Sequence, residues 1–163
     1  MANWCNNHVT CTGSAADISK FKQLLQDGIE YMRKFQQATS LGVDIEEGYF
    51  FDLYINEQDL PTQLVFTYDT KWSPNIKDLA NVAKKANLDM VCEYCECGFD
   101  IYGTATIESN GEYVDEEVSA EFIDLIEYSD EDGWYTYDGI EYETIGDVIE
   151  EKYGEWKLNQ QNN

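Results

Sequence analysis

The clearest hydrophobic pattern in the chain is helical and lies near the N-terminus. Apolar residues recur at intervals of three and four positions from Ile18 to Met32, which places them on one face of a helix. Asp17 follows Ser14 by three positions, a spacing close to that of an N-terminal capping box. The pattern therefore predicts a long helix over residues 15–37 with one apolar face.

Shorter stretches rich in β-branched and aromatic residues predict strands before and after this helix. Glycine, proline and asparagine bound these stretches and favour turns. Ser73 and Pro74 predict the N-cap and the first position of a second helix. Proline is tolerated there because an N–H at the first helical position has no acceptor within the helix. The predicted strands cover residues 1–12, 49–55, 64–68, 88–97 and 103–107.

The order of these elements indicates the fold class. Strand–helix–strand–strand–helix–strand over residues 1–107 predicts an α+β, ferredoxin-like fold, an antiparallel sheet with two helices on one face. The helical and strand spacings predict one core beneath the two helices. This core is expected to include Leu24, Leu25, Ile29, Phe66, Leu79 and Val91.

Residues 108–158 are expected to elaborate this sheet with acidic hairpins and a short helix. The dipeptides Asn110-Gly111 and Asp138-Gly139 are two-residue hairpin signals. Residues 119–128 fit either a short helix or a strand, and Thr144 is expected to cap a last helix. These residues therefore extend the ferredoxin-like part and supply no separate fold signature.

The chain of 163 residues is long enough to bury a core, and we expect a single domain over residues 1–163. Residues 159–163 are expected to form a polar tail. No basic start followed by an apolar run indicates a signal peptide, and no stretch is apolar enough for a membrane helix. Together with an odd number of cysteines, this predicts a cytoplasmic protein with reduced thiols.

The charge of the chain is concentrated in one stretch. The net charge is −23, and residues 86–151 hold 21 carboxylates without a lysine, arginine or histidine. Tyrosines and β-branched residues in this stretch indicate a folded surface and not a disordered tail. Because such a surface repels nucleic acids and anionic membranes, the partner that it favours is a basic protein.

Carboxylates and aromatic residues occur together in the predicted hairpins, where we expect the partner-binding surface. Aromatic side chains are effective anchors in protein interfaces, and the surrounding charges would select the partner. The alternative is a solvated acidic face that serves solubility alone. The predicted partner-binding residues are Asp115, Glu116, Glu117, Asp130, Glu131, Asp132, Trp134, Tyr135, Tyr137, Asp138, Glu141 and Glu143.

No arrangement of residues predicts catalysis, and no catalytic, cofactor-binding or metal-binding residue is assigned. His8 is the single histidine, and no serine or cysteine stands in a recognisable context as its partner. The acidic turn at residues 130–133 resembles part of a calcium loop, but Tyr128 and Gly139 occupy the first and last ligand positions. We therefore expect a protein that acts by binding.

Three cysteines near the middle of the chain suggest a zinc site at first sight. On a strand, Cys95 and Cys97 would point to one face and Cys92 to the other, which separates the three thiols. A zinc ion would also need a fourth ligand, for which His8 and Cys5 are the candidates. Buried, reduced thiols are therefore expected, and a small-ligand or metal site built on the cysteines or the acidic turns is kept as the alternative.

Three short motifs resemble a known family. They are the opening Met-Ala-Asn-Trp-Cys-Asn-Asn at residues 1–7, Lys-Trp-Ser-Pro at residues 71–74, and Tyr-Cys-Glu-Cys-Gly at residues 94–98 with Ile101 and Gly103 after it. Together they resemble the YubB ferredoxin-like family of small phage and plasmid proteins. In that family the last motif reads Tyr-x-Glu-x-Gly-x-x-Phe-x-Gly, so Ile101 stands in the phenylalanine position.

The resemblance covers about two-thirds of the chain and does not extend to the acidic residues beyond about Ser109. It implies a ferredoxin-like fold and an origin in a mobile element, and it transfers no catalytic residue. Combined with the acidity, it leads to the expectation of a DNA mimic that inhibits a host defence protein, as an anti-CRISPR or anti-restriction protein does. Such a mimic needs dense carboxylates, because duplex DNA carries one charge per ~1.7 Å of its axis.

Overall fold

The computed structural model describes residues 3–56, 60–96, 98 and 100–161. Its contacts divide the chain into two compact units, Met1–Glu117 (unit 1) and Val118–Asn163 (unit 2). From the sequence, one domain is expected whose ferredoxin-like part ends at residue 107. The boundary lies later because a further strand, β6 (Tyr113–Glu117), pairs with the preceding strand and so belongs to the sheet of unit 1.

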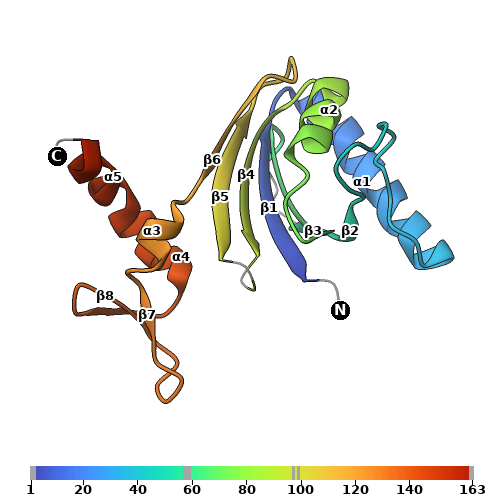
Figure 1. The fold of residues 1–163 in the computed structure, drawn as a ribbon. Helices are drawn as coiled ribbons and strands as arrows, with labels where there is room; N and C mark the ends of the chain where they lie inside the picture. Colours follow the sequence, from blue (N-terminus) through green and yellow to red (C-terminus); the bar gives the residue numbers. More distant parts are fainter. Residues whose placement is uncertain (1–2, 57–59, 97, 99, 162–163) are drawn as a thin grey trace. The chain divides into compact units, whose positions relative to one another are not determined.

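Unit 1 is built on an antiparallel sheet of six strands (Figure 1). Their order is β2-β3-β1-β4-β5-β6, and the first four strands of this order have the ferredoxin-like arrangement. The α+β, ferredoxin-like fold predicted from the sequence is therefore confirmed. The other strands are β1 (Trp4–Thr12), β2 (Phe51–Asn56), β3 (Gln63–Lys71), β4 (Asp89–Glu96) and β5 (Ile101–Ile107).

Two helices, α1 (Ala15–Phe35) and α2 (Ile76–Ala86), cover one face of this sheet (Figure 1). The start of α1 is as predicted, since the hydroxyl of Ser14 accepts a hydrogen bond from the backbone N–H of Asp17. The start of α2 lies two residues later than predicted, with Asn75 as N-cap. The Asn75 side chain does not cap this helix, because it accepts a hydrogen bond from the Tyr68 hydroxyl instead.

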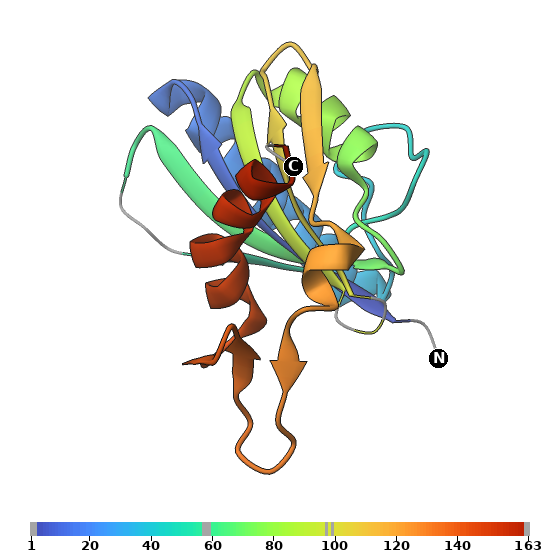
Figure 2. The ribbon, with the colours of Figure 1, turned by 60° about the vertical axis from the view of Figure 1, so that its left-hand side comes forward.

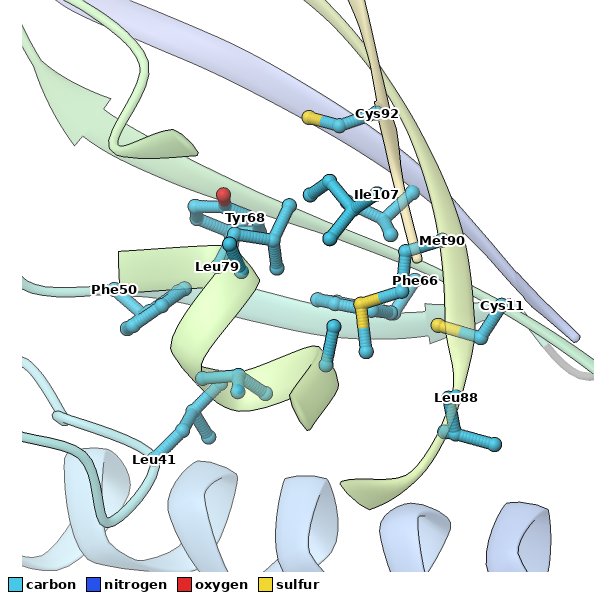
Figure 3. Close-up of a cluster of buried hydrophobic side chains, with 14 of the residues drawn as sticks. Cys11, Leu41, Phe50, Phe66, Tyr68, Leu79, Leu88, Met90, Cys92 and Ile107 are labelled. Carbon is cyan, nitrogen blue, oxygen red and sulfur yellow. The ribbon is translucent and has the colours of Figure 1, made fainter. Parts of the chain in front are cut away.

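The core of unit 1 fills the space between the sheet and the two helices (Figure 3). Leu25, Phe66 and Leu79 are buried in it as predicted, and Leu24 and Ile29 pack against it partly buried. The prediction for Val91 was wrong, since this side chain is 41% exposed. Its neighbours Met90 and Cys92 face the helices, so strand alternation turns Val91 to the opposite face of the sheet.

One glycine of the motif that runs from β4 into β5 is required by close packing. A Cβ on Gly103 would lie 2.2 Å from the Tyr94 hydroxyl oxygen, because the Tyr94 ring lies against the backbone of Gly103. Gly98 is exposed, a Cβ on it would meet only the ends of the Asn3 and Glu96 side chains, and its N–H donates to the buried carboxylate of Glu96. Close packing of the Tyr94 ring therefore explains why the motif has glycine at position 103.

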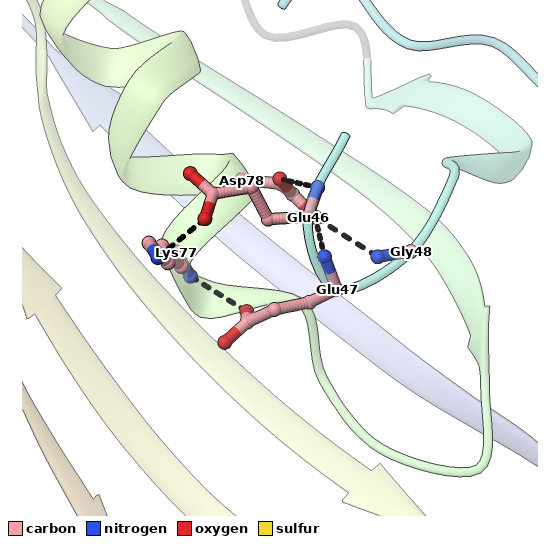
Figure 4. Close-up of polar contacts among 5 residues, drawn as sticks. All are labelled: Glu46, Glu47, Gly48, Lys77 and Asp78. Atoms are coloured by element: carbon pink, nitrogen blue, oxygen red, sulfur yellow. Dashed lines mark hydrogen bonds and ion pairs between the residues drawn. The ribbon is translucent and has the colours of Figure 1, made fainter. Parts of the chain in front are cut away.

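The loop before β2 is held by a buried carboxylate of α2 (Figure 4). Asp78 is fully buried and accepts hydrogen bonds from the backbone N–H groups of Glu46, Glu47 and Gly48 at 2.8, 2.8 and 2.9 Å. In return, the Glu47 carboxylate accepts a hydrogen bond from the backbone N–H of Lys77 in the first turn of α2. Loop and helix thus satisfy each other's backbone groups.

Unit 2 contains a small sheet of three short strands in the order β7-β8-β9 and several short helices (Figure 2, orange to red). The stretch that fitted helix or strand contains both, first a helix and then a strand. The elements are α3 (Ala120–Ile123), β7 (Glu127–Tyr128), β8 (Tyr135–Tyr137), β9 (Ile140–Tyr142), α4 (Ile145–Val148), a π-helix (Ile149–Tyr153) and α5 (Gly154–Gln161).

The local signals predicted for unit 2 are present. Asp138 and Gly139 have positive φ values of 50° and 77°, as a tight hairpin turn between β8 and β9 requires. Thr144 caps α4 and forms a reciprocal capping box with Asp147. The polar tail predicted over residues 159–163 is helical as far as Gln161, because α5 continues through it, and the last two residues lie outside the described part.

The core of unit 2 is aromatic. Phe122 is fully buried, and the rings of Tyr137, Tyr153 and Trp156 lie 5.3, 5.2 and 5.6 Å from its ring centroid. The Tyr153 hydroxyl also accepts a hydrogen bond from the backbone N–H of Ser119. These contacts join α3, β8 and the C-terminal helices around one side chain.

Candidate acidic protein-binding surface

Three of the predicted partner-binding residues, Asp115, Glu116 and Glu117, lie on β6 at the edge of the unit 1 sheet. All five side chains of this strand are exposed. Oδ1 of Asp115 accepts a hydrogen bond from the hydroxyl of Tyr94 at 2.8 Å. Burial, together with this bond to a carboxylate, raises the pKa of Tyr94, so its proton is held firmly.

Asp130, Glu131 and Asp132 occupy the tip of the hairpin that joins β7 and β8. Two backbone hydrogen bonds close this tip, from the Ser129 N–H to Trp134 at 3.0 Å and from the Gly133 N–H to Ser129 at 2.8 Å. All three carboxylates are exposed. A hydrogen-bonded turn therefore presents three adjacent carboxylates to solvent.

Asp138, Glu141 and Glu143 lie on the second hairpin of unit 2, and all three are exposed. Asp138 is in the turn itself, Glu141 is on β9, and Glu143 directly follows this strand. The β8–β9 pairing positions them on the same small sheet as the first hairpin. Unit 2 therefore carries the larger part of the predicted surface.

The acidic side chains of unit 2 meet little opposite charge. Unit 2 holds 13 carboxylates and two lysines. Within the described part of the chain, ion pairs join Lys20 to Asp17, Lys77 to Glu46 and Lys152 to Glu151. None of these pairs includes Asp130, Glu131, Asp132, Asp138, Glu141 or Glu143. These carboxylates are therefore exposed to solvent without a lysine or arginine beside them in any of the three ion pairs.

The three aromatic residues of the predicted surface differ in their surroundings. Trp134 is 38% exposed. Tyr135 is half-buried, and its ring lies 4.9 Å from that of Tyr128. Tyr137 was predicted to bind a partner, but its ring packs on Phe122 in the core of unit 2. Sequence alone did not separate these roles, because a three-residue strand shows too little alternation.

The structure thus places three of the twelve predicted residues in unit 1 and nine in unit 2. The hairpin signal at Asn110-Gly111 predicted that β6 pairs with the strand before it, which is β5. It contained no information on the other side of β6, where none of the strands that the structure describes is paired with it. The edge position of β6 is the feature of the surface that was not predicted from the sequence.

The residues considered for a metal site lie on both faces of the unit 1 sheet. Cys5 and Cys92 are buried on the face covered by the helices, where Cys11 also lies, whereas His8 and Cys95 lie on the opposite face. Cys97 lies outside the described residues. In the described ranges no group of three or more histidine, cysteine, aspartate or glutamate side chains is arranged to hold a metal ion.

The buried thiols are expected to resist alkylation in the folded protein. Burial raises the pKa of Cys5 to about 11 and raises the pKa of Cys11 and Cys92 further. Because the thiolate is the reactive form, these three should react roughly 100-fold more slowly than in denaturant at the same pH. Mass spectrometry of labelled peptides measures the rates.

Titration in denaturant without reductant should detect all five thiols. Fewer than five would contradict the expectation of reduced cysteines, and rapid labelling of Cys92 in the native protein would contradict its burial.

None of the helices that the structure describes is long and apolar enough to cross a membrane. In comparisons with known proteins, residues 50–123 match the ferredoxin-like domain in Api92-like protein. This match begins just before β2 and ends with α3, and so includes β6. No curated protein and no solved structure shows a significant match to the chain. The ferredoxin-like fold that the family resemblance implied is therefore supported by the strand order and by this match, and the chain carries a ferredoxin-like domain similar to the one in Api92-like protein.

Proposed function

We propose that this chain is an acidic, non-enzymatic binding protein that docks on a basic, nucleic-acid-binding surface of another protein. One observation supports the proposal above all. The carboxylates of the two unit 2 hairpins are exposed on a folded frame, and none of Asp130, Glu131 and Asp132 is in an ion pair within the described residues. A surface of this kind attracts cationic grooves from a distance and repels nucleic acid itself.

The mode of action would be competition with nucleic acid for one site. A protein groove that binds duplex DNA carries lysine and arginine side chains spaced to meet phosphates. Carboxylates held on short hairpins can meet the same side chains without the flexibility of a disordered acidic tail. The partner-binding residues would then be the carboxylates of both hairpins and of β6, with Trp134 as an exposed aromatic anchor.

The resemblance to phage and plasmid proteins suggests the class of target. For a protein of a mobile element, a basic nucleic-acid-binding partner would be a host defence protein, such as a restriction or CRISPR nuclease. Inhibition would follow from occupation of its DNA site, in the cytoplasm of a bacterial host. The acidity supports the basic partner, and only the resemblance supports the defence context.

The test is competition with labelled duplex DNA for purified restriction and CRISPR nucleases. We expect the wild-type chain to displace DNA from its target. The triple variant Asp130→Asn, Glu131→Gln, Asp132→Asn should compete roughly 10-fold less well at about 0.1 M salt, mainly through slower association. This difference should shrink at about 0.5 M salt, because the Debye length falls below ~10 Å.

A matched control removes three exposed carboxylates outside the acidic stretch, with Asp27→Asn, Glu30→Gln and Asp44→Asn. This variant has the same net charge as the first and should compete almost as well as the wild type. Equal losses in both variants would show that only net charge matters, and no displacement by the wild-type chain from any nuclease would count against the proposed target class. If the first variant only aggregates more and competes normally, the charge serves solubility.

A further inference from the structure

The two edges of the unit 1 sheet differ in a way that bears on partner binding. At one edge, the register of β2 with β3 shifts between Phe51 and Tyr54, and Asp52 has a positive φ of 45°. Such an irregularity disrupts the row of backbone groups that another strand would need. At the other edge, β6 keeps one regular register with β5 over all its residues. Only the β6 edge offers a regular template.

The register also shows which backbone groups of β6 point outward. In antiparallel pairs, hydrogen-bonded and non-hydrogen-bonded residue pairs alternate. The Glu108 N–H donates to the Glu112 carbonyl at 2.8 Å, which makes this pair hydrogen-bonded. By this alternation Val114 is in a hydrogen-bonded pair with β5, whereas Tyr113 and Asp115 are in non-hydrogen-bonded pairs. The N–H and C=O groups of Tyr113 and Asp115 are therefore directed away from the sheet.

The side chains of β6 limit what can pair with this edge. Asp115, Glu116 and Glu117 follow one another, and Val114 is 64% exposed. A second copy of the chain pairing through β6 would bring carboxylates close to carboxylates, which is unfavourable. A strand with basic residues opposite the three carboxylates would instead form favourable cross-strand pairs. Charge complementarity thus selects a basic segment and disfavours self-association.

We propose that β6 binds an extended basic segment of the partner protein by antiparallel strand addition. The segment would place three successive basic residues opposite Glu117, Glu116 and Asp115, followed by apolar residues opposite Val114 and Tyr113. Main-chain hydrogen bonds to Tyr113 and Asp115 would supply affinity, and the carboxylates would supply selectivity. This inference rests on the proposed function, since it specifies how the carboxylates of β6 engage the basic partner.

The test uses the full chain and a short capped peptide in which three lysines precede two valines. We expect the peptide to bind and to slow hydrogen exchange at the amides of Tyr113 and Asp115, observed by NMR. A second peptide with the same side chains but N-methyl groups on alternate amides keeps the charge and loses the edge hydrogen bonds. It should bind at least about 10-fold more weakly, the factor that corresponds to 1.4 kcal/mol.

Equal affinity of the two peptides would overturn strand addition and leave only electrostatic attraction. Absence of binding at millimolar peptide, or binding without protection of Tyr113 and Asp115, would also overturn it. The charge-swap variant Glu116→Lys, Glu117→Lys supplies a second readout. It should no longer bind the lysine peptide and should bind a peptide with glutamates in place of the lysines. Retained binding of the lysine peptide would contradict the proposal.

The outcome is separable from that of the proposed function. Competition with DNA is tested through Asp130, Glu131 and Asp132 in unit 2, whereas the peptides report on β6 in unit 1. Loss of peptide binding with intact competition would remove strand addition alone. Peptide binding without any DNA competition would leave strand addition in place and remove the proposed mimicry.

Discussion

Replacing Asp78 by alanine should lower the free energy of unfolding of unit 1 by about 3–5 kcal/mol. The carboxylate accepts three backbone hydrogen bonds, from Glu46, Glu47 and Gly48, and is fully buried (Figure 4). Hydrogen bonds to a charged group contribute more than neutral ones, and partly buried N–H groups left without an acceptor cost their full desolvation. Urea unfolding measures the loss of free energy of unfolding, and hydrogen exchange of the backbone amides of β1 and β3 shows that it belongs to unit 1.

Two further variants show whether the acceptor atoms are the cause. Asp44→Ala removes one negative charge from an exposed position in the same loop and should change stability little. Asp78→Asn keeps the shape of the side chain but replaces one acceptor oxygen by a donor, so it should destabilise as well. If Asp78→Ala were no less stable than Asp44→Ala, the loop would not depend on this carboxylate.

Replacing Phe122 by alanine should destabilise unit 2 by about 3–5 kcal/mol, a loss that a short chain segment cannot absorb. The ring is fully buried and contacts the rings of Tyr137, Tyr153 and Trp156. All these contacts lie within unit 2. We therefore expect residues 118–161 to lose hydrogen-exchange protection, while the central strands of unit 1 keep theirs.

Leu125→Ala is the matched control for Phe122→Ala. Leu125 lies three residues later in the same unit and is half exposed, so its truncation should lower the free energy of unfolding much less. Tryptophan fluorescence gives an independent readout when Trp4 and Trp72 of unit 1 are replaced by phenylalanine, because the remaining indoles, Trp134 and Trp156, lie in unit 2. Equal loss of protection in both units would contradict their description as separate compact units.

The local elements of the fold were predictable because their signals are local. Ser14 predicts the start of α1 by capping, and Asp138-Gly139 predicts a hairpin turn by its tolerance of positive φ. The prediction for α2 was wrong at its N-cap, since the first helical hydrogen bond runs from the Leu79 N–H to the Asn75 carbonyl, whereas the Ser73 carbonyl accepts from the hydroxyl of Thr70 in β3. Val91 was assigned to the core because the faces of a strand with apolar residues on both sides cannot be told apart from the pattern alone.

The charge of the candidate surface was predictable from the sequence, but the positions of its side chains in space were not. The absence of lysine, arginine and histidine from residues 86–151 is a property of the sequence, as is the partner charge that it favours. The roles of the aromatic residues depend on contacts between distant positions. Tyr137 meets Phe122 in the core, whereas Trp134 is exposed, although both belong to one aromatic segment.

The sequence by itself determined the charge of this protein, the ferredoxin-like order of its elements, and most of its caps and turns. These depend on residue type and on neighbours within a few positions, where propensity and capping act. Only the tertiary structure decided that β6 is a regular edge, that Asp78 is buried beneath three N–H groups, and that Phe122 is the centre of unit 2. Each of these features arises from the packing of segments far apart in the chain, and burial alone converts an ordinary aspartate or phenylalanine into a residue on which a whole unit depends.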